Sequence, residues 1–231
     1  MIEVVGHRGA AAIEPENTLR GFRRALELGV DSTECDVHLS RDGRLVVIHD
    51  DTVDRTTDGS GEVRAMTFAQ VRALDAGLGE RVPTLREVLA TVSGKVPLHV
   101  ELKAPGTEQA AVQAVQEMRM EGAVIFTSFD LRRLRRVRRI DPSLEVGAIF
   151  GKASEDCCTG TLAVGAKSIY VYHKELTRGL VDEAHEQGLR VGGWNPDSEP
   201  EWQDVIALGV DLVSTNRPDG LIAMLARDGL R

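Results

Sequence analysis

Residues 30–51 read VDSTECDVHLSRDGRLVVIHDD, two β-branched runs joined by an Asp-Gly pair. β-Branched residues favour strands and Asp-Gly favours a tight turn, so this stretch predicts a β-hairpin whose second strand ends at His49. Side chains alternate between the two faces of a strand, so Glu34 and Asp36 point to the same side. Two like charges on one face repel each other, which predicts either a cation between them or a face open to water.

Short β-branched runs and runs with helical periodicity alternate along the rest of the chain. The expected strands cover residues 2–5, 32–37, 44–49, 97–102, 123–128, 145–150, 167–172, 190–194 and 211–215. The expected helices cover residues 18–29, 83–92, 108–120, 131–140, 177–188, 199–209 and 217–228. About eight strand-helix units in a chain of this length predict an α/β fold, a TIM (β/α)₈ barrel, as one domain over residues 1–231.

A doubly wound open sheet is the alternative architecture. That fold would be better supported by a G-x-G-x-x-G turn after the first strand, where this chain has GHRGAA. Residues 50–82 interrupt the alternation, because they are rich in turn residues and show no clean helical pattern. We expect them to form a small insertion after the second strand unit, on the face of the barrel that carries the active site.

Composition excludes several classes of protein. The net charge is −8, which does not favour binding to nucleic acid. Hydrophobic residues make up 42% of the chain, yet no stretch approaches the ~18 apolar residues of a membrane span, and the N-terminus lacks a signal-peptide pattern. We therefore expect no stable membrane insertion and a cytoplasmic location; a homo-oligomer remains open. The three cysteines, two of them adjacent, do not suggest a disulfide framework.

Charged residues stand at the ends of the first three expected barrel strands. In TIM barrels the active site lies at the C-terminal ends of the strands, so Glu34, Asp36 and Glu101 are expected to converge there. Converging buried carboxylates need a counter-charge, and ligation by oxygen alone suits Mg²⁺ or Ca²⁺ better than zinc. The alternative is that these acids cap helices or pair with arginine.

Two histidines and two basic residues belong to the same set of strand ends. His7 and His49 follow β-type runs and titrate near neutral pH, so they are candidates for general acid and base. Arg8 and Lys103 would supply positive charge for a phosphate. With a metal ion, these residues describe phosphoryl transfer to water on a small-molecule phosphodiester; the alternative is a purely structural role for each histidine.

The segments that carry these residues resemble the glycerophosphodiester phosphodiesterase family. The resemblance runs in order over nearly the whole chain and is most specific in the first half. It rests on HRGAAAIEPENT (7–18), GVDSTECDVHLSRDGRLVVIHDDTVDRTT (29–57), VPTLREVL (82–89), HVELK (99–103), VGGWN (191–195) and GVDLVSTNRPD (209–219).

The resemblance implies a TIM barrel with an inserted segment and metal-dependent hydrolysis of glycerophosphodiesters to glycerol 3-phosphate and an alcohol. Carried over by position, it implies metal ligands at Glu34, Asp36 and Glu101, an acid/base pair at His7 and His49, phosphate contacts at Arg8 and Lys103, and a pocket tryptophan at Trp194. Two alternatives remain: a lysophospholipase D-like or sphingomyelinase D-like phosphodiesterase using the same site, and a catalytically silent barrel that binds metal or phosphate.

Some positions depart from the family or stay outside its motifs. The family often has Asn where this chain has His99, which we expect deep in the barrel, and Thr where this chain has Asn195. His38 shares a face with Asp36 and is expected on the surface of the hairpin. The arginine-rich helix at residues 131–140 is expected to be a solvated outer face, with contact to anionic lipid as the alternative.

Overall fold

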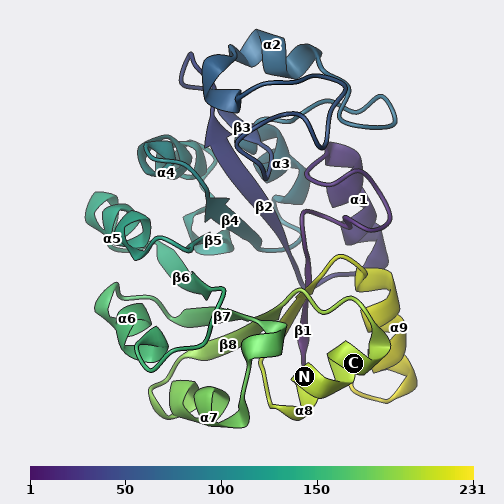
Figure 1. Ribbon diagram of the computed structural model, residues 1–231, viewed down its shortest axis with the longest axis vertical. Coiled ribbons are helices and arrows are strands. Elements are labelled where there is room, and N and C mark those ends of the chain that lie inside the picture. Colours follow the sequence, from purple (N-terminus) through teal and green to yellow (C-terminus); the bar gives the residue numbers. More distant parts are fainter.

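The computed structural model covers residues 1–231 and shows a closed barrel of parallel strands (Figure 1). β1 pairs in parallel with both β2 and β9, which closes the sheet. The predicted TIM barrel is confirmed. Its strands are β1 (Glu3–Gly6), β2 (Ser32–Leu39), β4 (Leu98–Leu102), β5 (Val124–Ser128), β6 (Glu145–Phe150), β7 (Ser168–Tyr172), β8 (Arg190–Trp194) and β9 (Leu212–Thr215).

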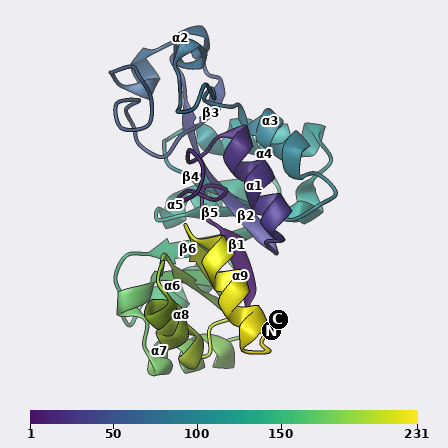
Figure 2. The same cartoon turned by 90° about the vertical axis from the view of Figure 1, so that its right-hand side faces the viewer.

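Helices surround the barrel on its outside (Figures 1 and 2). They are α1 (Leu19–Leu28), α3 (Leu85–Val92), α4 (Thr107–Glu117), α5 (Leu131–Ile140), α6 (Cys157–Ala163), α7 (Arg178–Glu186), α8 (Glu199–Ala207) and α9 (Pro218–Arg227). Single 3₁₀ turns occur at η2 (Glu121–Ala123) and η3 (His173–Glu175). The sequence did not predict α6, because its seven residues, CCTGTLA, are mostly weak helix formers.

Helix ends follow from local capping chemistry. α1 begins where the Thr18 hydroxyl accepts a hydrogen bond from the Gly21 amide at 3.1 Å. It ends at Gly29, whose φ of 82° is a left-handed conformation that glycine adopts without penalty. At the start of α3, Thr84 and Glu87 form a reciprocal capping box. These caps fix the lengths of the loops that carry the charged strand-end residues.

The expected insertion lies beyond the ring of barrel helices, around α2 in Figure 2. It follows β3 (Leu45–Val47), which pairs antiparallel with β2, and contains η1 (Val63–Ala65) and α2 (Phe68–Ala73). The sequence pattern did not predict α2, because six residues are too few to show a helical periodicity. The segment packs on a small apolar core of its own, formed by Val46, Ile48, Val53, Val63, Val71, Ala76 and Val82.

The barrel interior is filled by an apolar layer below the strand ends. Val5, Ile149, Tyr170 and Leu212 form this layer, and Trp194 packs on it. Glycine in neighbouring strands leaves room for the large rings: a Cβ atom on Gly147 would lie 2.4 Å from Cε2 of Tyr170. The space above this layer, at the C-terminal ends of the strands, is the pocket described next.

Candidate active site

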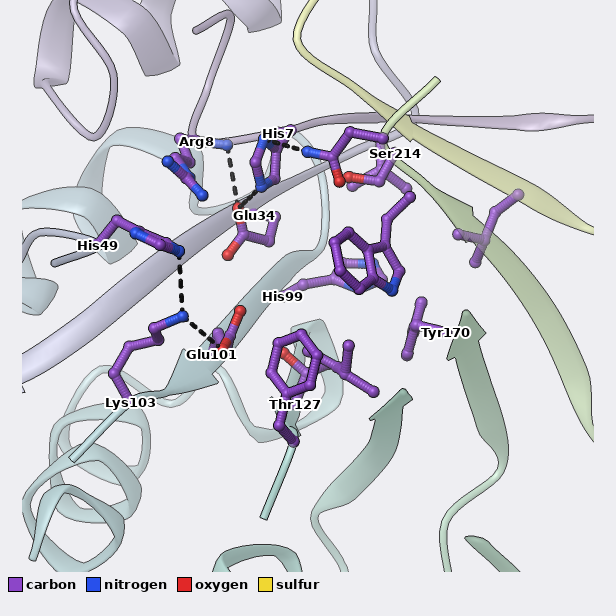
Figure 3. Close-up of a pocket in the computed structure, with 16 residues that line it drawn as sticks. His7, Arg8, Glu34, His49, His99, Glu101, Lys103, Thr127, Tyr170 and Ser214 are labelled. Carbon is purple, nitrogen blue, oxygen red and sulfur yellow. Dashed lines mark hydrogen bonds and ion pairs between the residues drawn. The ribbon is translucent and has the colours of Figure 1, made fainter. Parts of the chain in front are cut away.

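A cavity of about 300 Å³ opens at the C-terminal ends of the barrel strands (Figure 3). Its two sides differ in chemistry. β1, β2, β4 and the segment after β3 line one side with charged residues and histidines, whereas β5 to β9 line the other mainly with apolar and aromatic residues. The charged side contains His7, Arg8, Glu34, His49, Glu101 and Lys103.

Three carboxylates from two adjacent strands meet beside this cavity. Glu34 and Asp36 lie on β2 and Glu101 lies on β4, where the strand register places Glu101 opposite Asp36. One oxygen of each lies within 4.8 Å of the others, and all three residues are buried. Oε1 of Glu34 and Oδ1 of Asp36 have no hydrogen-bond partner. Unpartnered buried carboxylate oxygens are costly, so this cluster fits a divalent cation bound by oxygen.

The pKa values of the three acids reflect their burial first and the neighbouring charges second. Burial, followed by the charges of Asp36 and Glu101, raises the pKa of Glu34 well above its ordinary value. Burial and Asp36 raise the pKa of Glu101 to about 7. Burial would also raise the pKa of Asp36, but Arg8 and Lys103 outweigh it and lower that pKa. The protein's own cations thus favour the charged form of Asp36, and a bound divalent ion would favour the charged forms of the other two acids.

His7 follows β1 and is held through one ring nitrogen. Its Nδ1 lies 2.7 Å from Oδ1 of Asn216, and the amide of Asn195 lies against the same nitrogen. The Asn216 amide is oriented by Asp197, which accepts a hydrogen bond from Nδ2 of Asn216 at 2.6 Å. Oδ1 of Asn216 is therefore the atom that faces His7, which assigns the proton to Nδ1. The Asn195 amide, placed with its Nδ2 against the same nitrogen, must then turn its unpartnered Oδ1 toward this proton. The free nitrogen, Nε2, lies 3.8 Å from Glu34.

His49 is held by a carboxylate. Its Nδ1 lies 2.6 Å from Oδ1 of Asp50, and its Nε2 lies 3.1 Å from Nζ of Lys103 (Figure 3). The pKa of Asp50 lies below its ordinary value because Arg55, and then His49, bond to the carboxylate. Lys103 also donates to Glu101 at 2.9 Å, which links His49 to the acidic cluster.

Arg8 lies between the acids and the loop after β1. Its backbone amide donates to Glu34 at 3.0 Å, and its guanidinium lies 3.3 Å from Asp36. The residue adopts φ 50°, a left-handed conformation that is uncommon outside glycine. The next residue, Gly9, has φ 86° and lies so close to α1 that a Cβ atom there would approach the Gly21 carbonyl carbon to 2.6 Å. This sharp turn aims both the amide and the side chain of Arg8 at the acids.

Trp194 ends β8 on the apolar side of the cavity. Its ring centroid lies 5.5 Å from that of Phe129 and 5.2 Å from that of Tyr172. Its indole Nε1 has no partner within the protein. The wall opposite the acids is therefore aromatic and carries an unused hydrogen-bond donor.

The structure gathers all eight residues predicted for the site at this end of the barrel. His99 is buried and lines the inner part of the cavity, as expected. The expectation for His38 was wrong: this residue is 7% exposed, and its Nε2 lies 3.1 Å from the His49 carbonyl oxygen. β2 runs to Leu39 and β3 covers it, so the position is interior.

Sequence reasoning did not identify four residues that contact the two histidines or their partners. They are Asp50, Arg55, Asp197 and Asn216. Asp50 adjoins His49, and Asn216 directly follows β9, so a strand-end search extended to the last strand would have found the second. Arg55 lies within the quoted family segment 29–57 but at no strand end, and nothing in the sequence pattern marks Asp197.

The fold and the site define a TIM-barrel enzyme with acids, histidines and two cations around a cavity at the strand ends. The profile of the Glycerophosphoryl diester phosphodiesterase family matches residues 7–220. The chain therefore belongs to this family of phosphodiester hydrolases, as its motifs indicated. It is 36% identical to a glycerophosphodiester phosphodiesterase of Caldanaerobacter subterraneus subsp. tengcongensis, over 98% of both chains.

Solved structures agree with this assignment. A putative glycerophosphoryl diester phosphodiesterase from Silicibacter pomeroyi superposes with a TM-score of 0.93 at 28% identity, covering 100% of this chain and 95% of its own. A phosphodiesterase from Oleispira antarctica, solved with the product sn-glycerol-3-phosphate, superposes with a TM-score of 0.90 at 26% identity, covering 97% and 96%.

The helices of this chain are short or polar, and none has the length and apolar character needed to span a bilayer.

Proposed function

We propose that this chain hydrolyses glycerophosphodiesters, such as glycerophosphocholine or glycerophosphoethanolamine, to glycerol 3-phosphate and an alcohol. We further propose that the reaction depends on Mg²⁺ or Ca²⁺ and on proton transfer by His7 and His49. The observation that carries the proposal is the buried acid cluster with two unpartnered oxygens, placed beside two histidines and two cations. Membership of the family and the product complex of the Oleispira antarctica relative support the choice of substrate.

Glu34, Asp36 and Glu101 would hold the ion through one oxygen each. A bound divalent cation polarises the phosphoryl oxygens and offsets the charge that develops on them. Arg8 and Lys103 flank the same acids, and each lies within 4 Å of Asp36. Their side chains bind and orient the phosphate group, so that its non-bridging oxygens face positive charge on both sides.

The partners of the histidines divide the two proton-transfer roles. Burial, and then Arg8, lower the pKa of His7 to about 4, so its imidazole is neutral near pH 7 and Nε2 can take a proton from the attacking hydroxyl. The second histidine, His49, is oriented by Asp50 through Nδ1 at 2.6 Å, which leaves Nε2 to serve the leaving group. We therefore assign His7 as the base and His49 as the acid that protonates the leaving alkoxide.

A metal screen tests the proposal. The protein is treated with chelator, dialysed, and assayed on glycerophosphocholine with Mg²⁺, Ca²⁺ or no metal, with coupled detection of glycerol 3-phosphate. We expect turnover only with a divalent ion, and a loss of at least ~10²-fold for Glu101→Gln. Glu155→Gln, a change at an exposed position on the loop before α6, is the matched control and should leave turnover unchanged.

The same assay separates the alternatives. Turnover of lysophosphatidylcholine with none of glycerophosphocholine would contradict the proposed substrate. Full activity after removal of the metal would contradict the role of the acid cluster. Absence of turnover on both substrates with every metal would favour a binding barrel over an enzyme.

A further inference from the structure

Arg55, in the inserted segment, is the point where two separate loops of the site meet. Its guanidinium donates to both oxygens of Asp50, from Nε at 2.7 Å and from Nη2 at 3.1 Å. It also donates to both oxygens of Glu16, from Nη1 at 2.7 Å and from Nη2 at 2.8 Å. Two bidentate pairs on one guanidinium use its planar fork fully and fix its position relative to both carboxylates.

Each of these carboxylates holds one residue of the site. Asp50 holds His49 through Nδ1, at 2.6 Å. Glu16 accepts a hydrogen bond from Nη1 of Arg8 at 2.9 Å. The order of contacts is thus His49, Asp50, Arg55, Glu16 and Arg8, an unbroken path from the proposed acid to the proposed phosphate contact.

The three central residues of this path come from two parts of the chain. Glu16 lies in the loop between β1 and α1, whereas Asp50 and Arg55 both follow β3, in the insertion. Without the guanidinium, Asp50 and Glu16 would be two anions near one another, free to turn toward water or toward the metal site. Exposed ion pairs add little stability, but a bidentate network fixes geometry, and geometry is what proton transfer requires.

The insertion can hold Arg55 because it is itself well supported. Two residues before Arg55, Val53 is fully buried in the small core of the segment. Two residues after it, the Thr57 hydroxyl donates to the Val53 carbonyl at 2.7 Å. The arginine side chain is half exposed and takes no part in that core, so its truncation is compatible with a folded insertion.

We propose that Arg55 is a positioning residue for the reaction: it sets the Asp50–His49 pair and the Glu16–Arg8 pair relative to each other. The inference rests on the proposed function, in which His49 protonates the leaving group and Arg8 binds phosphate.

The test compares two leaving groups on the same glycerol phosphate. Choline leaves as an alkoxide and needs a proton from His49, whereas p-nitrophenolate leaves without one. We expect Arg55→Ala to lower kcat about 10- to 100-fold on glycerophosphocholine and less than about 5-fold on glycerol 3-phosphate p-nitrophenyl ester, because loss of an outer hydrogen-bond partner typically has that size. A lysine at this position cannot form both bidentate pairs, so kcat of Arg55→Lys should lie between those of Arg55→Ala and the wild type.

Arg64→Ala is the matched control. Arg64 lies in the same insertion, is largely exposed, and pairs only with its neighbour Glu62. This variant should retain kcat on both esters, and all three variants should unfold within a few degrees of the wild type. A general loss of folding in Arg55→Ala would lower kcat on both esters equally. Equal losses of kcat would overturn the inference, and so would a kcat within about 2-fold of the wild type on both esters.

The wild-type rates distinguish this failure from failure of the proposed function. If the wild type releases glycerol 3-phosphate from both esters and Arg55→Ala shows no selectivity for the leaving group, only the positioning role is wrong. If the wild type releases it from neither ester with any divalent ion, the proposed function is wrong and the positioning role falls with it.

Discussion

His7 and His49 face the same cluster of acids but are held in opposite ways. The Nδ1 of His7 meets a neutral amide, Asn216, which lies 209 residues away in the chain. The Nδ1 of His49 meets a carboxylate, Asp50, which is its own neighbour in the chain. His7 is also the more buried of the two, with a side chain 14% exposed against 30% for His49.

The difference shows how one pocket can give two identical side chains different partners at the same ring nitrogen. An amide accepts the Nδ1 proton without adding negative charge, so the low-dielectric surroundings keep His7 neutral. At His49 a carboxylate accepts at the same nitrogen and fixes the orientation of the ring. The proposed division of the proton-transfer roles rests on these two different neighbours.

The largest expected effect tests this division directly. His7→Ala and His49→Ala should each lower kcat on glycerophosphocholine on the order of 10³-fold, because each removes a proton-transfer group. With p-nitrophenolate as the leaving group, only His49→Ala should recover to within about 10-fold of the wild type. Steady-state kinetics on the two esters measures this. Recovery of His7→Ala in place of His49→Ala would reverse the assignment.

A smaller effect is expected at the carboxylate. Asp50→Asn should lower kcat about 10²-fold on the choline ester, since His49 loses the carboxylate acceptor at Nδ1 that orients its ring. The loss should shrink on the p-nitrophenyl ester, as it does for His49→Ala. Asp51→Asn, at the adjacent exposed position, is the control. If both esters lose activity equally, Asp50 holds the loop and does not support the acid.

A fall in kcat of roughly 10-fold is expected when Asn216, whose amide holds His7, is replaced by alanine. Asn216→Ala removes the acceptor at Nδ1, so the ring loses its fixed orientation and Nε2 points less often at the nucleophile. Because the base acts before the leaving group departs, kcat should fall equally on both esters, with KM little changed. A loss confined to the choline ester would show that His7 also serves the leaving group.

The smallest effect concerns stability. The pKa of His7 falls from 6.5 to about 4 on folding, so the unfolded chain takes up this proton first as the pH is lowered. The stability from neutral His7 is therefore fully present above about pH 6.5 and is lost as the pH falls toward 4. In chelator, the free energy of unfolding of the wild type should fall over this pH range. The fall in His7→Gln should be smaller, by on the order of 2 kcal/mol. Urea titrations at pH 7 and pH 4.5 measure it, and parallel drops would contradict a neutral, buried His7.

The sequence predicted the parts of the site that lie on single strands. Glu34 and Asp36 share a face because alternate residues of a strand do so, and β2 confirms it. His38 belongs to the same face, but its burial could not be predicted, because it depends on β3 folding over that end of β2. Local strand geometry predicts the direction in which a side chain points, but it does not predict which other elements bury that side chain.

Hydrogen-bond partners from distant segments of the chain also could not be predicted from the sequence. Asn216 meets His7 only because β9 pairs with β1 and closes the barrel. Asp197, in the loop after β8, orients the Asn216 amide, and Arg55, in the insertion, contacts Glu16. Short helices such as α2 and α6 were missed for a different reason, since six or seven residues carry too little periodicity to be recognised.

The amino-acid order alone determined the barrel, the family, and the identity of the charged residues at the strand ends, because strand alternation and motif spacing are local properties of a chain. Only the closed fold decided which nitrogen of His7 is free and which arginine joins the loops of the two histidines. The first depends on Asn216, 209 residues from His7, which reaches the ring only after β1 and β9 have paired. The second depends on the insertion, which brings Arg55 to Glu16.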